Sequence, residues 1–130
     1  MKLKPADQMK KVILGIIEKN GKVDEFQKGD EFHLRIENEP YMPLVIERHS
    51  DRVMVTHYYN QNGDLIADPD VEFMILGDKW FPAAMQDTFG HTEVLSHNSD
   101  TGLFEVATKK YSSVLSFTNM WARNIKAQGF

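Results

Sequence analysis

The stretch from residue 53 to residue 70, VMVTHYYNQNGDLIADPD, holds the densest set of side chains that could do chemistry. It contains one imidazole, His57, followed by the carboxylates of Asp64, Asp68 and Asp70. A carboxylate next to an imidazole can orient it as a general base or raise its pKa. One hypothesis is therefore a hydrolase-type enzyme that uses His57 with one of these aspartates, with or without help from a divalent metal.

The dipeptide Asn62-Gly63 in this stretch is typical of a two-residue hairpin turn, because a type I′ turn needs positive φ at both central residues. Such a turn sets the register of its two arms. Three cross-strand pairs are then expected: Gln61 with Asp64, Tyr59 with Ile66, and His57 with Asp68. Pairs of this kind commonly stabilise sheets, and no motif ties a Ser, Thr or Cys nucleophile to His57. We assign no catalytic residue and take as candidate binding residues His57, Tyr59, Asn62, Asp64 and Asp68.

Calcium is a second hypothesis for the same stretch, because it is rich in hard oxygen ligands. These come from Asn60, Asn62, Asp64, Asp68 and Asp70. Their spacing does not match the EF-hand loop, and the five histidines include no H-x₃-H pair for zinc. Asn, Asp, Gly and Pro also suit turns for backbone reasons alone. We expect no metal and no other cofactor.

Apolar residues recur at helical spacing near both ends of the chain. The two stripes are Met9, Val12, Ile13, Ile16 and Ile17, and Val114, Phe117, Trp121 and Ile125. Asn20-Gly21 is expected to end the first helix, and Ser112 or Ser113 to begin the second. The sequence therefore predicts an N-terminal and a C-terminal amphipathic helix.

Between the helices the apolar period changes to two, which is typical of strands with one face on the core. The segments with this pattern are EFHLRIE, MPLVIERHSDRVMVTHYY, VEFMIL, KWFPAAM and LFEVATKK. Gly77-Asp78 is expected to form a tight turn, and residues 87–102 to be mainly loop, with room for a short strand at Glu93 to Leu95. We predict one α+β domain over residues 1–130, with two layers: a mainly antiparallel meander sheet of about five strands packed with the N-terminal and C-terminal helices.

Composition narrows the function classes. The formal charge is −4, and no Lys/Arg cluster is larger than a pair, so binding to nucleic acid is not expected. The chain has no cysteine, which excludes disulfides and a cysteine nucleophile and is compatible with a cytoplasmic location. The apolar part of the N-terminal segment is too short for a signal peptide or a membrane span. We expect a soluble protein that does not contact a membrane.

A longer run, PLVIERHSDRVMVTHYYNQNGDLIADPDVEFMI, contains the core HYY-x-QNGDL-x-x-DP-x-x-x-F. From Pro43 to about Phe81 it resembles a family of small uncharacterised bacterial and phage proteins that are often carried on mobile elements. The resemblance implies a compact domain with a shared hairpin and no known activity, so no catalytic residue is carried over. It also implies a genomic setting in which small acidic proteins often bind host proteins.

The sequence favours a non-enzymatic protein-binding or regulatory module that acts on a protein partner through an exposed sheet face or the 57–70 hairpin. The hydrolase that uses His57 with Asp64, Asp68 or Asp70 is the alternative. A binder of a small ligand in a cleft between sheet and helix is a third possibility. A pocket on which these four side chains converge would favour the enzyme.

Overall fold

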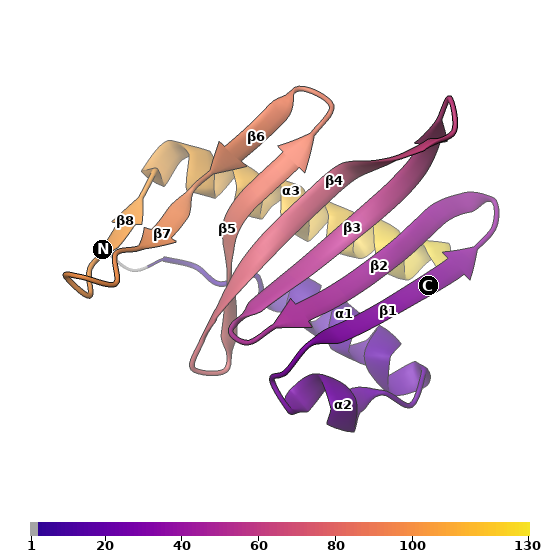
Figure 1. The fold of residues 1–130 in the computed structure, drawn as a ribbon, viewed down its shortest axis with the longest axis horizontal. Helices are drawn as coiled ribbons and strands as arrows, with labels where there is room; N and C mark the ends of the chain where they lie inside the picture. Colours follow the sequence, from indigo (N-terminus) through magenta and orange to yellow (C-terminus); the bar gives the residue numbers. More distant parts are fainter. Residues whose placement is uncertain (1–2) are drawn as a thin grey trace.

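The computed structural model describes residues 3–130 as an α+β fold whose main sheet lies in front of two long helices (Figure 1). The elements are α1 (Asp7–Lys19), α2 (Val23–Gln27), β1 (Phe32–Asn38), β2 (Tyr41–His49), β3 (Arg52–Gln61), β4 (Asp64–Leu76), β5 (Lys79–Asp87), β6 (Gly90–Glu93), β7 (Leu95–His97), β8 (Phe104–Val106) and α3 (Thr108–Gln128). The main sheet is a six-stranded antiparallel meander in the order β1 to β6, and β7 pairs with β8 in a small second sheet. The predicted fold class is confirmed, with one strand more in the main sheet than expected.

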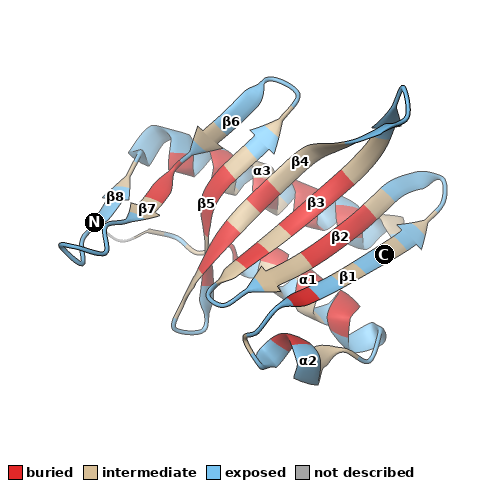
Figure 2. Cartoon of the chain, in the orientation of Figure 1, coloured by how far each residue is buried: buried red, intermediate tan, exposed pale blue. Residues whose placement is uncertain are grey.

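Both predicted apolar stripes face the core. Met9, Ile13, Ile16 and Ile17 of α1 are buried, as are Val114, Trp121 and Ile125 of α3, whereas Val12 and Phe117 lie half-buried at the edges of the stripes. Gly21, with a φ of 70°, follows the end of α1 as predicted. Figure 2 shows the matching buried residues along the middle of β2 to β5. The helices therefore cover one face of the sheet and leave the other without a helical layer.

One short element and one helix boundary differ from the prediction. The helix α2 was not predicted, and its Phe26 is buried edge-on against Phe32, with ring centroids 5.3 Å apart. The helix α3 begins at Thr108 and not at Ser112 or Ser113. Its first turns are held by the buried Tyr111, whose hydroxyl donates to the carbonyl oxygen of Lys4 at 2.6 Å. Contacts with distant parts of the chain account for both differences, because Phe26 of α2 also packs against Trp80, with ring centroids 6.0 Å apart.

The segment 87–102 contains β6 and β7, so the prediction that it is mainly loop was wrong. The strand β6 pairs with the second half of β5, from Ala84 to Asp87. The backbone N–H of Val94 then donates to the carbonyl oxygen of Ala83 at 2.7 Å and continues the contact with β5. The sequence of this segment is rich in turn-forming residues, but hydrogen bonds to the neighbouring strand β5 hold part of it in a β conformation.

The two predicted hairpin turns are present. The turns at Asn62-Gly63 and Gly77-Asp78 join β3 to β4 and β4 to β5 as predicted. Within residues 3–130, no helix is long and apolar enough to cross a membrane.

We predict that Trp121→Ala lowers the free energy of unfolding by about 3–5 kcal/mol, the usual range for a large buried aromatic side chain. Trp121 is 5% exposed and its ring lies 5.9 Å from that of Phe117. Met120→Ala is the matched control, because Met120 is its neighbour in α3 but is 40% exposed, and it should cost less than about 1 kcal/mol. Urea denaturation measures both, and similar losses in the two variants would place α3 outside the core.

Candidate functional site

The face of the main sheet that α1 and α3 do not cover, here called the open face, is mostly polar. It looks toward the viewer in Figure 1. The cross-strand register places on it His33 and Arg35 of β1, Val45, Glu47 and His49 of β2, Arg52, Met54, Thr56 and Tyr58 of β3, Asp70 and Glu72 of β4, Ala84 and Gln86 of β5, and His91 and Glu93 of β6. Strand alternation explains this, because the residues between them point to the helices.

The open face is hollowed over β3 to β6. The hollow has a volume of about 260 Å³ and is lined by Met54, Asp70, Glu72, Ala84, Gln86, His91 and Glu93. Three of these side chains are carboxylates, one is an imidazole, and none is a lysine or arginine. Met54 and Ala84 supply its apolar part. We call this feature the acidic hollow, and its composition suits a cationic group.

Asp70 is the most perturbed carboxylate of the acidic hollow. Its Oδ1 accepts a hydrogen bond of 3.0 Å from the hydroxyl of Thr56, which is 4% exposed. Burial raises the pKa of Asp70, and the negative charge of Glu47 raises it further, against the lowering effects of Thr56 and His91. Burial also raises the pKa of Tyr58, with Asp70 and Glu47 adding to the effect. Burial is the main cause of both pKa shifts, and the neighbouring carboxylates add to it.

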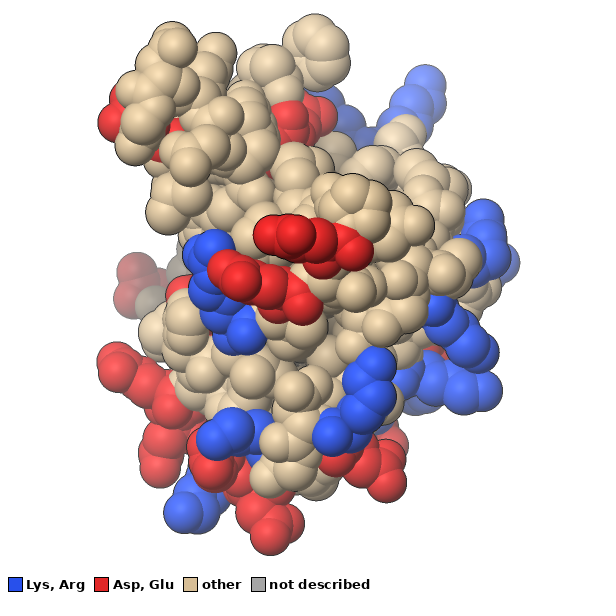
Figure 3. Space-filling model, turned by 90° about the vertical axis from the view of Figure 1, so that its right-hand side faces the viewer, with Lys and Arg blue, Asp and Glu red and all other residues tan. Residues whose placement is uncertain are grey.

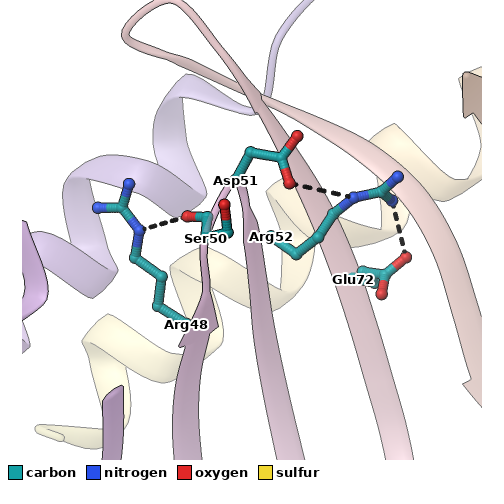
Figure 4. Close-up of polar contacts among 5 residues, drawn as sticks. All are labelled: Arg48, Ser50, Asp51, Arg52 and Glu72. Atoms are coloured by element: carbon teal, nitrogen blue, oxygen red, sulfur yellow. Dashed lines mark hydrogen bonds and ion pairs between the residues drawn. The ribbon is translucent and has the colours of Figure 1, made fainter. Parts of the chain in front are cut away.

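Only part of this negative charge is neutralised. Arg52 Nη1 donates to Glu72 Oε2 at 3.1 Å, and Arg52 Nε lies 3.8 Å from Asp51 Oδ1 (Figure 4). Among the residues that the structure describes, neither Asp70 nor Glu93 has a lysine, arginine or histidine nitrogen within 4.0 Å of a carboxylate oxygen. Two carboxylates of the acidic hollow are therefore available to a cation from outside the chain.

The turn between β2 and β3 separates two arginines with different roles. Arg48 and Arg52 point away from each other in Figure 4. Arg48 Nε donates to the carbonyl oxygen of Ser50 at 2.8 Å, and its Nη1 donates to that of Phe26 at 2.9 Å. Its guanidinium also lies 5.1 Å from the centre of the Phe26 ring. Arg48 thus connects α2 to the sheet, whereas Arg52 pairs with a carboxylate of the open face.

His57 lies on the opposite side of the sheet from the acidic hollow. It is 7% exposed, and its ring centroid is 5.5 Å from that of Trp121 and 5.7 Å from that of Phe130. Its Nδ1 donates to the carbonyl oxygen of Pro43 at 3.2 Å. Burial lowers the pKa of His57, although hydrogen bonding to the backbone opposes this shift. The imidazole is therefore a neutral part of the core near pH 7.

The predicted pairing of His57 with Asp68 was wrong. Gln61 pairs with Asp64 and Tyr59 with Ile66 as expected, but the register shifts between Thr56 and Tyr58. Thr56 then faces Asp70 and Tyr58 faces Ala67. Asp68 instead accepts a hydrogen bond from the hydroxyl of Thr88. An extra residue in β4, between Ala67 and Asp70, therefore moves Asp70 to the face opposite His57.

The other predicted binding residues lie on the β3–β4 hairpin, which extends beyond the rest of the sheet (Figure 1). Asn62 and Asp64 are exposed at its tip and Tyr59 is half-buried. Their role in binding stays a prediction. Sequence reasoning did not single out Glu72, His91 or Glu93, although strand alternation around β4 could have placed Glu72 beside Asp70 on one face.

The candidate metal ligands of the hairpin lie apart in the structure. Among residues 3–130, no three or more His, Cys, Asp or Glu side chains are arranged to hold a metal ion. Asp64, Asp68 and Asp70 are spread over the hairpin tip, a contact with Thr88 and the open face. We still predict that the hairpin binds neither calcium nor zinc in solution.

Comparison with known proteins yields one match. A family model described as "Domain of unknown function (DUF6908)" matches residues 11–130. No curated protein and no solved structure matches the chain. The match includes the whole main sheet and α3, and with them the acidic hollow.

We predict that Asp70→Asn stabilises the protein at pH 7 by up to about 1 kcal/mol, a small value because the group is only partly buried. The substitution keeps an acceptor for Thr56 and removes the charge. Because the folded-state pKa of Asp70 is raised, its contribution to stability is present at low pH and is lost as pH rises through that pKa. The advantage of the variant should therefore shrink toward pH 4.

Urea denaturation at pH 7 and pH 4.5 measures this difference. Asp64→Asn at the exposed hairpin tip is the matched control and should change stability by less than about 0.5 kcal/mol at both pH values. A destabilised Asp70→Asn at pH 7, or an advantage that does not depend on pH, would contradict the assignment.

The effect of His57 on the pH dependence of stability should be opposite to that of Asp70. Its folded-state pKa is below the unfolded value of 6.5, so its contribution to stability is lost as pH falls below about that value. In His57→Phe we expect a smaller fall in stability between pH 7 and pH 5 than in the wild type. His97→Gln, at an exposed position, should keep the wild-type fall. Equal falls in all three proteins would show that His57 is not held neutral in the core.

Proposed function

We propose that this chain, which belongs to the DUF6908 family, is a non-enzymatic protein-binding module whose open face takes a lysine or arginine side chain of a protein partner. The observation that carries the proposal is the acidic hollow, with three carboxylates and no lysine or arginine in its lining. A cation that enters it meets Asp70 and Glu93, which have no ion-pair partner among the described residues.

The carboxylates of the acidic hollow, on two different strands, support a long cationic side chain as the ligand. Asp70 lies on β4 and Glu93 on β6, with β5 between them. Neighbouring strands are about 4.8 Å apart, so these two strands are separated by roughly 10 Å. Ala84 on β5, between these two strands, and Met54 on β3, beside β4, can receive the methylene stem of lysine or arginine. Arginine gains more, because its planar fork can bind a carboxylate through two hydrogen bonds.

The unfavourable burial of a charged carboxylate at position 70 also supports a role in binding. Burial disfavours the charged form of Asp70. An amide would keep the hydrogen bond to Thr56 without that penalty, so the charge does not serve the stability of the fold. Residues that oppose stability in this way concentrate at functional sites.

The hydrolase alternative has less support. It needs His57 to act with Asp64, Asp68 or Asp70, but His57 packs under α3 while Asp70 lies on the open face. A general base has to reach the proton that it removes, and His57 is 7% exposed. The acidic hollow contains a different imidazole, His91, but its lining has no Ser, Thr or Cys.

The setting that we propose follows the resemblance in the sequence. A protein with a net charge of −4 that is carried on a mobile element and binds a host protein in the cytoplasm would use such a surface. The proposal for the acidic hollow does not depend on this setting.

Titration with an arginine-containing peptide tests the proposal. We expect a ¹⁵N-labelled protein to show shifts that centre on β4, β5 and β6 when a peptide of alternating Arg and Gly is added. The double variant Asp70→Asn, Glu93→Gln should weaken binding at least about tenfold, as expected for the loss of two charged contacts. The affinity should also fall with added salt.

The matched control is Asp100→Asn, Glu105→Gln, which removes the same net charge from exposed positions outside the acidic hollow. It should bind the peptide like the wild type. Shifts spread over the whole acidic surface, or an equal loss in the control, would reduce the effect to general charge attraction and refute a site at the acidic hollow.

A further inference from the structure

The charges of this chain are divided between its two layers. Together α1 and α3 carry seven Lys/Arg and two Asp/Glu, a net charge of +5, which leaves −9 on the rest of a chain whose total is −4. The right-hand side of Figure 3, where the helices lie, is dominated by lysine and arginine side chains. The helical layer of an acidic protein is therefore a basic surface.

A groove runs between α1 and α3 on this basic surface. Its volume is about 320 Å³, and its lining consists of Lys11, Val12, Gly15, Ile16 and Lys19 on the α1 side and Ile125, Lys126, Gly129 and Phe130 on the α3 side. The walls are largely apolar, three lysines provide the charge, and no carboxylate side chain is part of the lining. We call it the interhelical groove.

Gly15 explains why the groove exists. It lies in the middle of α1, where glycine costs about 1 kcal/mol relative to alanine. A Cβ built on Gly15 would meet nothing within 4 Å, so no neighbouring side chain of the described fold occupies the space above it. The missing side chain is not needed for packing α1 on α3, and it leaves the floor of the groove open.

From these features we infer that the interhelical groove is a second docking site, which takes an acidic amphipathic helix of a protein partner. The apolar lining can receive one or two anchoring side chains, since its volume is at the lower end of the roughly 300–1,000 Å³ of ligand pockets. Helices dock in this way through apolar residues spaced three and four apart. Carboxylates beside the anchors would then meet the lysines.

The spread of the lysines favours a helix over a single small anion. Lys11 and Lys19 are eight residues apart on α1, which is roughly 12 Å along the helix axis at 1.5 Å per residue. Lys126 lies on the other side of the groove. One carboxylate head group cannot neutralise charges so far apart, whereas a helix with several glutamates can.

This inference does not rest on the proposed function, because the interhelical groove and the acidic hollow lie on opposite sides of the sheet and attract ligands of opposite charge. A module with both sites could hold a basic and an acidic partner together. Variants of the acidic hollow should therefore leave binding at the interhelical groove unchanged.

A displayed library of helical peptides tests the inference. Each peptide has about sixteen residues, with leucine at two positions four apart and Glu, Gln, Lys or Ala elsewhere. We expect selection on the wild-type protein to enrich peptides with glutamate around the leucine pair. The best peptide, measured by fluorescence anisotropy, should bind at least about tenfold more weakly to Gly15→Leu, which fills the groove without a change at its lysines.

Charge is tested by a second pair of variants with equal net charge. Lys11→Gln, Lys19→Gln, Lys126→Gln removes the three lysines of the interhelical groove and should weaken the selected peptide at least about tenfold. Lys28→Gln, Lys109→Gln, Lys110→Gln removes three lysines outside its lining and should bind like the wild type. Thermal melts establish that every variant is folded, and Asp70→Asn, Glu93→Gln should retain the wild-type affinity for this peptide.

Several outcomes would overturn the inference. They are enrichment of lysine-rich peptides, no enrichment at all, or equal affinity of the selected peptide for the wild type and Gly15→Leu. Binding of dodecanoate or phosphatidylserine vesicles that depends on Gly15, without peptide binding, would identify a lipid site instead. Self-association in sedimentation velocity that Gly15→Leu abolishes would identify a second copy of this chain as the occupant.

Discussion

The cover that α1 and α3 provide over one face of the meander sheet is the constraint on which the other features depend. Val55 and Phe73 at the centre of the sheet are fully buried in one cluster with Ile13, Ile17 and Trp121 of the helices. Burial of apolar surface is the main favourable term in folding, and this chain has no disulfide to support it. Because both long helices lie on the same side, the opposite face meets water and can hold carboxylates.

A bulge in β4, between Ala67 and Asp70, then decides on which face of the sheet Asp70 lies. Side chains alternate along a strand, so a shift of one residue changes what lies opposite each position. On one side of the sheet His57 joins Trp121 and Phe130 in an aromatic cluster. On the other side Thr56 holds Asp70 beside the acidic hollow. An imidazole and a carboxylate that are close in sequence are thus kept apart by the sheet itself.

The net charge of −4 conceals two surfaces of opposite sign. The sheet side gathers carboxylates around the acidic hollow, and the helical side gathers lysines around the interhelical groove. Each surface combines charge with a recess that has apolar residues in it, which is the combination that gives a docking site both attraction and an anchor. If both proposals hold, one small protein would bind two partners that need not compete.

Local sequence patterns determined most of the elements, because helix periodicity, strand alternation and turn residues act over a few neighbouring positions. They predicted both long helices, the meander, and the turns at Asn62-Gly63 and Gly77-Asp78. Only the tertiary structure decided the elements α2, β6, β7 and the first turn of α3, since these depend on partners outside each element, such as Trp80, Ala83 and Lys4. The candidate site also depends on the tertiary structure. Sequence indicates that Asp70 and Glu93 are polar, but the pairing of β4 and β6 with β5 brings them to one hollow, and the one-sided helical layer leaves that hollow open. A strand's own residues set the direction of its side chains, whereas its neighbours and the cover on each face are set by packing between residues far apart in the chain.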